Sequence, residues 1–384
     1  MTDKKDYLCI LPFVHLYAGP MGETKPCCIA EPFQTDKNLN THSINEVFNS
    51  KEYIQLRLDM LNNKRNKICN VCYDAEDRGE ISSRLERNNK NQFDMPNITN
   101  GTVSTDFQYI DIRFSNQCNF KCRTCCHEFS SSWYEAEKQL IERKIIDHGT
   151  TNLDKKILKI ENNFIENIKL HLNNLKMVYF AGGEPLIMSE QYEILEYICK
   201  SKRSVHIHYN TNLSTLKYDE ESLIKMWKEI IVNKGSVYLA VSCDGLYDLG
   251  EYIRVGFKHK NFINNINQLK KNNISYGIQT TITTFNIYKV FETIEQMKEL
   301  KIIESTDDIT FFYAWGPIGV TVKNLSKAHK EEVMKLYDEN LDNVTKKTKL
   351  ELTNMLKFMG IDEGDHDAVT EYEKEVKEVF GVPK

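Results

Sequence analysis

The chain has neither a long apolar run nor a secretory signal. No segment approaches the roughly 20 consecutive apolar residues that a membrane-spanning helix needs. The first residues, MTDKKDYLCILPF, lack the apolar core and the small-residue cleavage site of a secretory signal. The sequence therefore predicts a cytoplasmic protein with no membrane partner.

Basic clusters are also missing. Lys and Arg number 50 against 55 Asp and Glu, which gives a formal net charge of -5. The charges alternate in sign and form no blocks, as is typical of solvated surface. Nucleic acid is therefore not an expected partner, because nucleic-acid-binding proteins usually carry a basic patch or stripe.

Cysteine, in contrast, is abundant, with 11 in the 384 residues. In a reducing compartment such cysteines bind metals or act in catalysis more often than they form disulfides. They fall into two groups and two singletons, at 9, 27, 28, 69 and 72, at 118, 122, 125 and 126, and at 199 and 243. This grouping predicts two metal sites.

Strands and helices alternate over the central part of the chain. Segments rich in β-branched or aromatic residues predict strands at 109–115, 176–181, 204–209, 236–242, 275–283 and 308–315. Helices are predicted at 191–200, 221–232, 262–271 and 288–300. This alternation indicates an α/β fold of parallel βαβ units. Six units are too few for a closed eight-stranded barrel, so a partial (β/α)6 TIM-like barrel or an open doubly wound sheet is expected.

The composition divides the chain into four parts. Residues 1–83 form a small cysteine-rich domain, in which Ser43 is predicted to cap a helix over 44–61. The polar stretch 84–104 is predicted to be a linker, residues 105–325 the barrel, and residues 326–384 a helical C-terminal extension. Within the barrel, the long insertion 129–175 is predicted to be mostly helical.

The first metal site is expected on Cys118, Cys122 and Cys125, directly after the first barrel strand. Cluster iron prefers thiolate ligands, and three ligands on four irons leave one iron open, as a catalytic site requires. The spacing alone leaves zinc as an alternative, with Cys126 or His127 as the fourth ligand.

Polar residues end the following strands. Gly182, Gly183 and Glu184 end the second, where two glycines allow close backbone approach to a ligand and a carboxylate can accept from an ammonium. Candidate ligand contacts on the later strands are Asn210, Ser242, Asp244 and Arg254. Ordinary turn chemistry and a surface arginine are the alternative interpretations.

Two cysteines stand alone. Cys199 falls in a predicted helix and is interpreted as a small buried apolar residue. Cys243 follows the fourth strand. One hypothesis makes it a hydrogen donor to a substrate radical, and the alternative makes it a core thiol.

The second metal site is expected on Cys9, Cys27, Cys69 and Cys72. Gly22 and Pro26 predict a hairpin that places Cys27 opposite Cys9, with Cys28 as the alternative ligand. Four thiolates make a closed site, and their spacing is compatible with either iron–sulfur or zinc.

The sequence CNFKCRTC after a strand resembles the CxxxCxxC motif of the radical S-adenosylmethionine (SAM) superfamily. AGGEP resembles the family's GGE motif, and SCDG…YIRVG resembles its SxDG…R segment. Thr124 replaces the aromatic residue that many members have before the third cysteine. The resemblance implies a partial barrel and a 4Fe–4S cluster held by three cysteines and by SAM. It also implies cleavage of SAM to a 5′-deoxyadenosyl radical, which abstracts a hydrogen atom from substrate.

The segments CILPFVHLYAGPMGETKPCC, SINEVFNSKEYIQLR and ICNVC resemble the SPASM/twitch auxiliary-cluster module, placed here before the barrel. The resemblance implies a second, auxiliary 4Fe–4S cluster that assists electron transfer, with zinc as the alternative metal.

Together these features predict an iron–sulfur oxidoreductase or modifying enzyme. Its expected substrate is a peptide, a protein or a small metabolite, and its reductant an external low-potential donor such as flavodoxin or ferredoxin. The alternatives are a non-catalytic iron–sulfur or zinc scaffold and a nucleic-acid-modifying radical SAM enzyme. A scaffold would have no use for the GGE, SCDG and Arg254 features together.

Overall fold

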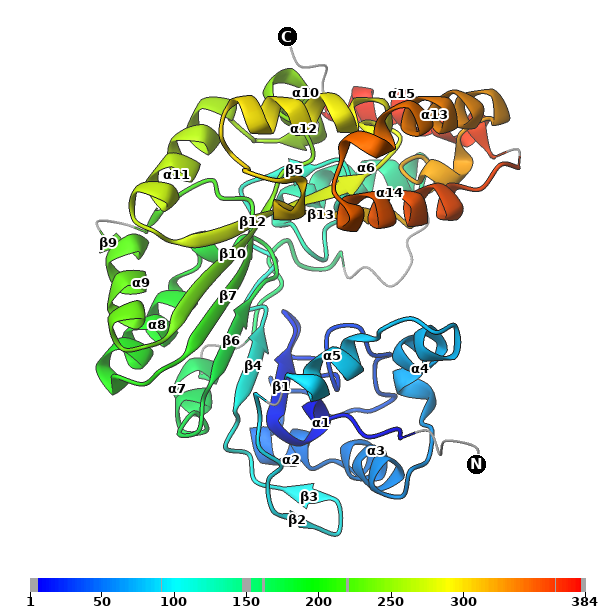
Figure 1. The fold of residues 1–384 in the computed structure, drawn as a ribbon. Coiled ribbons are helices and arrows are strands. Elements are labelled where there is room, and N and C mark those ends of the chain that lie inside the picture. Colours follow the sequence, from blue (N-terminus) through cyan, green and yellow to red (C-terminus); the bar gives the residue numbers. More distant parts are fainter. Residues whose placement is uncertain are drawn as a thin grey trace. The chain divides into compact units, whose positions relative to one another are not determined.

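The computed structural model describes residues 6–90, 92–146, 153–160, 163–218, 221–362 and 364–380. Its main sheet has seven strands in the order β1-β4-β6-β7-β10-β12-β13 (Figure 1). They are β1 His15–Ala18, β4 Tyr109–Ile112, β6 Met177–Phe180, β7 His206–Thr211, β10 Ser236–Ser242, β12 Ser275–Ile282 and β13 Ile309–Tyr313. Pairing is parallel between β1 and β4, β4 and β6, β10 and β12, and β12 and β13. Among the described strands β1 and β13 are the two edges, so the predicted α/β fold without a closed barrel is confirmed.

Six of these strands match the predicted ones, and β1 was missed. Its four residues are all buried, so they show no alternation of apolar and polar residues. The predicted hairpin is present only in part, although Cys27 and Cys9 do line the same cavity. A turn is present, where Gly22 N–H donates to the Gly19 carbonyl at 2.9 Å, but residues 23–30 form no strand after it. Instead, β1 pairs with β4, about 90 residues later in the chain.

Helices separate the strands. They are α7 Phe164–Lys169, α8 Ser189–Ser201, α9 Leu223–Val232, α10 Tyr247–Ile253, α11 His259–Lys271 and α12 Val290–Glu299. In α8, Tyr192, Leu195 and Cys199 are buried, which is the spacing of one helix face. All four helices predicted between strands are present, within a few residues of their predicted ends.

The chain divides into two compact units. The first comprises Met1–Ser115, Leu158–His208 and Lys225–Val237, and the second comprises Asn116–Ile157, Tyr209–Ile224 and Tyr238–Lys384. In the part of the chain that the structure describes, no helix is both long enough and apolar enough to cross a bilayer.

The N-terminal part of the first unit is mostly helical. Its elements are α1 Leu11–Val14, α2 Ile44–Phe48, α3 Lys51–Leu61, η1 Lys67–Cys69, α4 Asn70–Asp77, α5 Ser83–Asn89, β2 Ile98–Thr99 and β3 Thr102–Val103. Ser43 caps α2 in a reciprocal capping box with Glu46, as predicted. The single helix predicted over 44–61 is two helices, because the chain leaves the helical conformation at Asn49 and Ser50. Helix α5 occupies the start of the predicted linker.

Arg57 of α3 ties these elements together. It is fully buried, and its guanidinium donates to the carbonyls of Pro12, Phe48 and Gly101 and to Asn49 Oδ1 at 2.7–3.1 Å. The same group lies 4.4 Å from the centre of the Phe48 ring. One side chain therefore joins α1, the end of α2, and the turn between β2 and β3.

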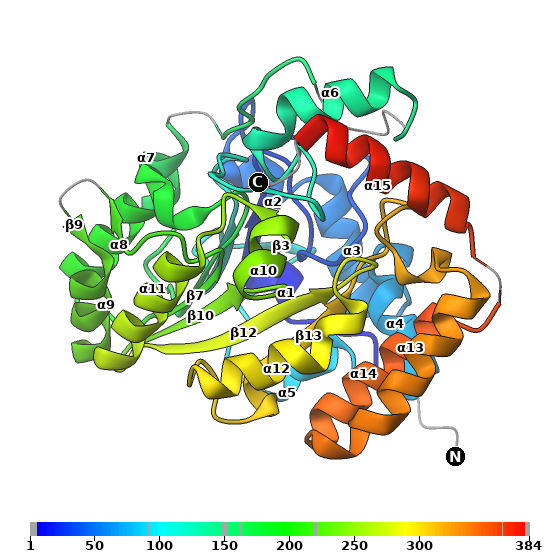
Figure 2. The ribbon, with the colours of Figure 1, turned by 90° about the horizontal axis from the view of Figure 1, so that it is seen from above.

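The second unit contains the tail. Besides α10, α11 and α12, this unit contains α6 Tyr134–Glu142 and the three tail helices α13 Lys327–Asn340, α14 Lys346–Met359 and α15 His366–Phe380, so the tail is helical as predicted. Helix α14 lies against β13 (Figure 2). Helix α15 contacts α6, where Tyr372 shares a buried cluster with Trp133 and Leu140. Parts of two predicted regions, 147–152 and 161–162 in the insertion and 363 and 381–384 in the tail, lie outside the described residues.

Several short elements complete the fold. They are β5 Lys121–Cys122, β8 Lys217–Tyr218, β9 Glu221–Ser222, β11 Arg254–Val255, η2 Ser131–Trp133, η3 Pro185–Ile187, η4 Ile287–Lys289, η5 Thr306–Asp308, η6 Val322–Asn324 and η7 Leu341–Asn343. The pair formed by β5 and β11 is antiparallel and sets Arg254 opposite Cys122.

Candidate functional site

Cys118, Cys122 and Cys125 lie together on one loop of the second unit. Burial raises the pKa of the Cys125 thiol well above its usual value, and the neighbouring Cys126, Cys122 and Cys118 raise it further. These mutual effects show that the three thiols are close enough to interact. The arrangement suits a cluster that takes up several thiolates on one side.

Hydrogen bonds fix the shape of this loop. Trp133 Nε1 donates to the Cys122 carbonyl at 2.7 Å, and Ser132 Oγ donates to the Cys118 carbonyl at 2.8 Å. The Cys118 sulfur accepts from the Phe120 backbone N–H at 3.4 Å and from Asn212 Nδ2 at 3.8 Å. Donors of this kind stabilise a thiolate and tune a bound cluster. The contact from Asn212 could not be predicted, because it comes from the end of a distant strand.

Cys126 and His127, the two candidates for a fourth zinc ligand, make contacts outside the group of three cysteines. The His127 side chain is buried, and its Nε2 lies 2.9 Å from the Lys156 carbonyl. Burial raises the pKa of Cys126 to about 11, and the carboxylates of Glu137 and Glu128 contribute to this rise.

Arg254 faces the cysteine loop from β11. Its Nη1 donates to Asp244 Oδ2 at 2.8 Å, and Asp244 Oδ1 accepts from the Thr281 backbone N–H at 2.8 Å. Burial lowers the pKa of Arg254, but Cys122 and Asp244 outweigh burial and hold that pKa above its ordinary value. Arg254 Nε is buried and has no partner among the described residues. Both carboxylate oxygens of Asp244 therefore accept hydrogen bonds from the protein, whereas the Nε–H of Arg254 has no acceptor among the described residues.

Gly182, Gly183 and Glu184 lie in the first unit, just after β6. Gly182 has a φ of +109°, and a Cβ on it would lie 3.0 Å from the Ser115 carbonyl oxygen. Gly183 N–H donates to the same carbonyl at 3.1 Å. Glu184 is buried, and its Oε1 accepts from the Leu186 N–H at 3.0 Å at the start of η3. Only glycine fits at 182, both because of the space and because of the backbone conformation.

The remaining predicted residues have distinct environments. Asn210 Oδ1 is buried without a partner in the described part of the chain. Ser242 is the last residue of β10 and is half-buried. Cys243 is fully buried, its Sγ donates to the Gly245 carbonyl at 3.3 Å, and burial raises its pKa to about 12. These contacts favour the core interpretation of Cys243. Cys199 is likewise buried, in α8.

A pocket of about 360 Å³ lies next to the cysteine loop in the second unit. Asn119, Asn212 and Ser214 contribute polar groups, and the rings of Phe257 and Phe262 contribute apolar surface. A mixed lining of this kind suits an aromatic base with polar edges.

Cys9, Cys27, Cys69 and Cys72 line one cavity of about 400 Å³ in the first unit. Apolar residues, one serine and one arginine complete its lining: Leu11, Pro12, Pro26, Ile29, Ala30, Val71, Ser83 and Arg84. Cys28 is not among the lining residues. The residue is exposed, burial raises the pKa of its thiol, and the thiol interacts electrostatically with Asp111 and Arg113.

The four thiols are spread around this cavity. Burial raises the pKa of Cys9, Cys27 and Cys69 to about 12 in each case. No three Cys, His, Asp or Glu side chains in the described ranges converge closely enough to hold a single metal ion. A zinc with four thiolates at 2.3 Å would hold the sulfurs about 3.8 Å apart, whereas the ligands of a 4Fe–4S cluster each bind a different iron. The donor set of four thiols therefore fits such a cluster.

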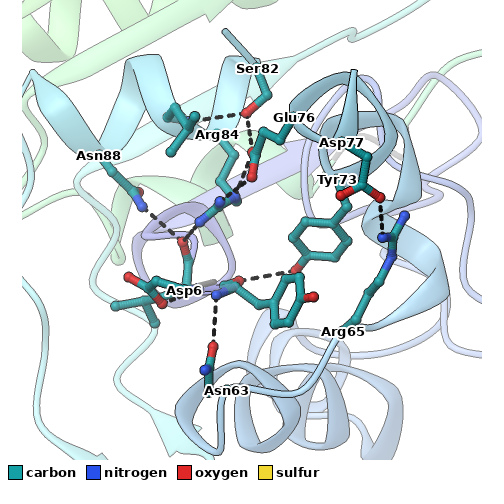
Figure 3. Close-up of polar contacts among 12 residues, drawn as sticks. Asp6, Asn63, Arg65, Tyr73, Glu76, Asp77, Ser82, Arg84 and Asn88 are labelled. Carbon is teal, nitrogen blue, oxygen red and sulfur yellow. Dashed lines mark hydrogen bonds and ion pairs between the residues drawn. The ribbon is translucent and has the colours of Figure 1, made fainter. Parts of the chain in front are cut away.

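Arg84 is the cation of this cavity. It is buried, its Nη2 pairs with Glu76 Oε2 at 2.5 Å, and its Nη1 donates to the Leu8 carbonyl at 2.6 Å. Ser82 donates to the other Glu76 oxygen, as Figure 3 shows. Arg84 also lowers the pKa values of Cys9 and Cys69 against the rise caused by burial. This pair could not be predicted from the sequence, since no spacing marks it.

Several solved structures are similar to parts of the chain. Native anSMEcpe with bound AdoMet is 15% identical, with a TM-score of 0.41 over 61% of this chain and 62% of that one. Streptococcus suis SuiB bound to precursor peptide SuiA is 13% identical, with a TM-score of 0.37 over 87% of this chain and 70% of that one.

One curated relative matches a shorter stretch. The GTP 3',8-cyclase of Campylobacter lari is 24% identical over 115 residues, which is 30% of this chain and 30% of that protein. The chain thus spans less than two thirds of this relative and of native anSMEcpe.

Two family profiles match the chain itself. The radical SAM superfamily matches residues 112–312, more than half of the chain, and the SPASM iron–sulfur cluster-binding domain matches residues 9–73. The first profile implies SAM and a 4Fe–4S cluster, and the second implies auxiliary iron–sulfur. The chain therefore belongs to the radical SAM superfamily and carries its SPASM domain before the barrel.

Proposed function

We propose that the chain is a radical SAM enzyme that abstracts a hydrogen atom from a peptide, a protein or a small metabolite. The observation that carries this proposal is the loop that gathers Cys118, Cys122 and Cys125, with Arg254 set against Cys122. When bound there, the 4Fe–4S cluster and SAM supply a 5′-deoxyadenosyl radical.

The chain's own residues would position SAM. Gly182 and Gly183 give its amine close access to the backbone, and Glu184 is the carboxylate that follows them. Arg254 has an unused donor for an anionic group, while Asp244 holds the guanidinium in place. Asn212 and Phe120 donate to the Cys118 sulfur and so stabilise the thiolate. The pocket that contains Phe257 suits the adenine.

The auxiliary cluster is proposed on Cys9, Cys27, Cys69 and Cys72, where it would take an electron from the substrate radical. An external low-potential donor such as flavodoxin or ferredoxin would reduce the barrel cluster. The buried Arg84 offsets part of the negative charge of four thiolates.

The proposed function is tested by reductive SAM cleavage with Gly182→Ala. Reconstituted anaerobically and reduced with dithionite, the wild type is expected to produce 5′-deoxyadenosine. Gly182→Ala should keep its iron but lose cleavage at least roughly tenfold, because the φ of +109° strains any residue with a Cβ and the methyl group would crowd the Ser115 carbonyl oxygen at 3.0 Å. The measurement is 5′-deoxyadenosine by chromatography.

Gly79→Ala is the matched control. Gly79 also has a positive φ, of +80°, but a Cβ there meets nothing within 4 Å. Its alanine variant also places a side chain at a positive φ but without the close contact, and cleavage should match the wild type. A wild type that holds iron and does not cleave SAM would contradict the proposed function.

Cys27→Ser and Cys28→Ser separate the two candidate auxiliary ligands. Cys27 lines the cavity and Cys28 does not. We expect Cys27→Ser to lower iron from about eight to about four per chain and Cys28→Ser to leave about eight. Iron and zinc are measured together by mass spectrometry. The reverse pattern would assign Cys28, and one zinc with about four irons in the wild type would make the N-terminal site structural.

A further inference from the structure

One face of the sheet in the first unit carries polar and aromatic side chains in successive rows, where each row consists of residues paired across neighbouring strands. The pairing of β1, β4 and β6 sets Tyr17 beside Asp111, and Asp111 beside Tyr179. In the preceding row the rings of His15 and Tyr109 lie 4.3 Å apart. Residues two apart on a strand share a face, so these rows form one continuous surface.

Two arginines reach this surface from separate elements. Arg113 lies two residues after Asp111. Its Nη1 donates to Asp111 Oδ1 at 2.8 Å, and its guanidinium lies 4.6 Å from the centre of the Tyr17 ring. Arg87 of α5 lies 5.5 Å from the centre of the Tyr109 ring. Both arginines are partly exposed, whereas Asp111 is fully buried.

Two buried atoms on this surface have no hydrogen-bond partner among the described residues, namely Asp111 Oδ2 and His15 Nε2. A purely structural ion pair would use both oxygens of a buried carboxylate, because an unsatisfied one is costly. Asp111 Oδ2 is therefore available to accept from a bound molecule.

Cations outnumber acids around this surface. The cations are Arg87, Arg113 and Lys25, whose Nζ lies 5.6 Å from the centre of the Tyr17 ring. The acids are Asp111 and Glu23, which both interact with Tyr17. The histidines add no charge at neutral pH. Burial, together with the nearby Arg87, lowers the pKa of His15 to about 3 and that of His208 to about 4.

We infer that this surface, which we call the Arg113 face and define by Tyr17, Arg87, Asp111, Arg113 and Tyr179, binds a carboxylate or a phosphate. A guanidinium presents parallel donors that match either anion. Asp111 Oδ2 accepts from a hydroxyl or ammonium on the same molecule. That the anion belongs to the enzyme's substrate rests on the proposed function, whereas the binding of the anion does not.

Cys28 provides a reporter for the Arg113 face. Cys28 is an exposed residue, and its thiol, whose pKa is raised by partial burial, interacts electrostatically with Asp111, Arg113 and Arg87. Iodoacetate and iodoacetamide alkylate the same thiolate, and only iodoacetate carries a carboxylate. The ratio of their rates at Cys28 therefore reports attraction of an anion and cancels the reactivity of the thiol itself.

The experiment uses the reconstituted full-length protein, with Cys28 alkylation resolved by peptide mass spectrometry. Arg113→Gln and Arg87→Gln are each expected to lower the iodoacetate-to-iodoacetamide ratio at least about threefold, because each removes one positive charge that interacts with Cys28. Arg65→Gln, which removes a charge that pairs with Asp74 and Asp77 instead, should leave the ratio unchanged. Inorganic phosphate or acetate, at constant ionic strength, should slow iodoacetate in the wild type.

The competing anion that protects Cys28 more strongly identifies the group that the face prefers. An unchanged ratio in Arg87→Gln, or protection by neither anion, would overturn the inference. Arg87→Gln keeps the test decisive if Arg113→Gln does not fold. Alkylation needs no SAM cleavage, so failure of the radical chemistry and failure of this inference give different results.

Discussion

Replacing Cys118, Cys122 and Cys125 together by alanine is expected to lower iron from about eight to about four per chain and to abolish SAM cleavage. The three thiols are on one loop, and each would bind a different iron, so their joint removal leaves no ligand for the barrel cluster. The auxiliary site should keep its iron, because its cysteines line a separate cavity in the first unit. Iron analysis and 5′-deoxyadenosine formation are measured on the same samples.

Cys199→Ala is the control for the triple variant. Cys199 is also buried, and its Sγ donates to the Met226 carbonyl at 3.8 Å, so its loss tests the removal of a thiol without loss of a cluster ligand. Iron and cleavage should both match the wild type. A triple variant that keeps about eight irons would show that the barrel cluster is held elsewhere.

Arg57→Met is expected to cause the largest loss of stability, lowering the free energy of unfolding by roughly 4 kcal/mol. The variant keeps most of the apolar stem but removes the donors to three backbone carbonyls and to Asn49. The three carbonyls are buried and would lose this donor without gaining water. Anaerobic urea unfolding followed by circular dichroism measures the change, with the m-values compared.

Arg65→Met removes an arginine from the same domain with a different expected result. Arg65 pairs with Asp74 and Asp77 at the surface, and its side chain is 32% exposed. Such pairs contribute less than about 1 kcal/mol, so the unfolding midpoint should hardly move. Equal effects of the two variants would show that Arg57 does not hold the N-terminal domain together.

The six predicted strands could be identified because each is bounded by turn residues and followed by a helical pattern. Strand β1 was not predicted from the sequence. It is short and buried on all sides, and its partner β4 is distant in sequence. Parallel pairing between such segments leaves no local pattern, since the hydrogen bonds join backbones and not particular side chains.

The candidate site shows the same limit. Cysteine spacing predicted two metal sites but did not choose between Cys27 and Cys28, because neighbouring residues differ only in the direction of their side chains. Arg84 and Asn212 reach the cysteines through tertiary contacts. Asp111 and Arg113 were predicted only as part of a strand, since the open oxygen of Asp111 becomes apparent once its neighbours are in place.

The pairing of β1 with β4 determines how separable the SPASM domain is. Because residues 15–18 form the outer strand of the barrel's own sheet, the boundary between the two domains runs through backbone hydrogen bonds. A chain that began after residue 83 would leave the backbone of β4 open at a sheet edge, where other chains could add. The SPASM domain is thus joined to the barrel through the sheet itself, and its removal would turn β4 from an inner strand into an edge strand.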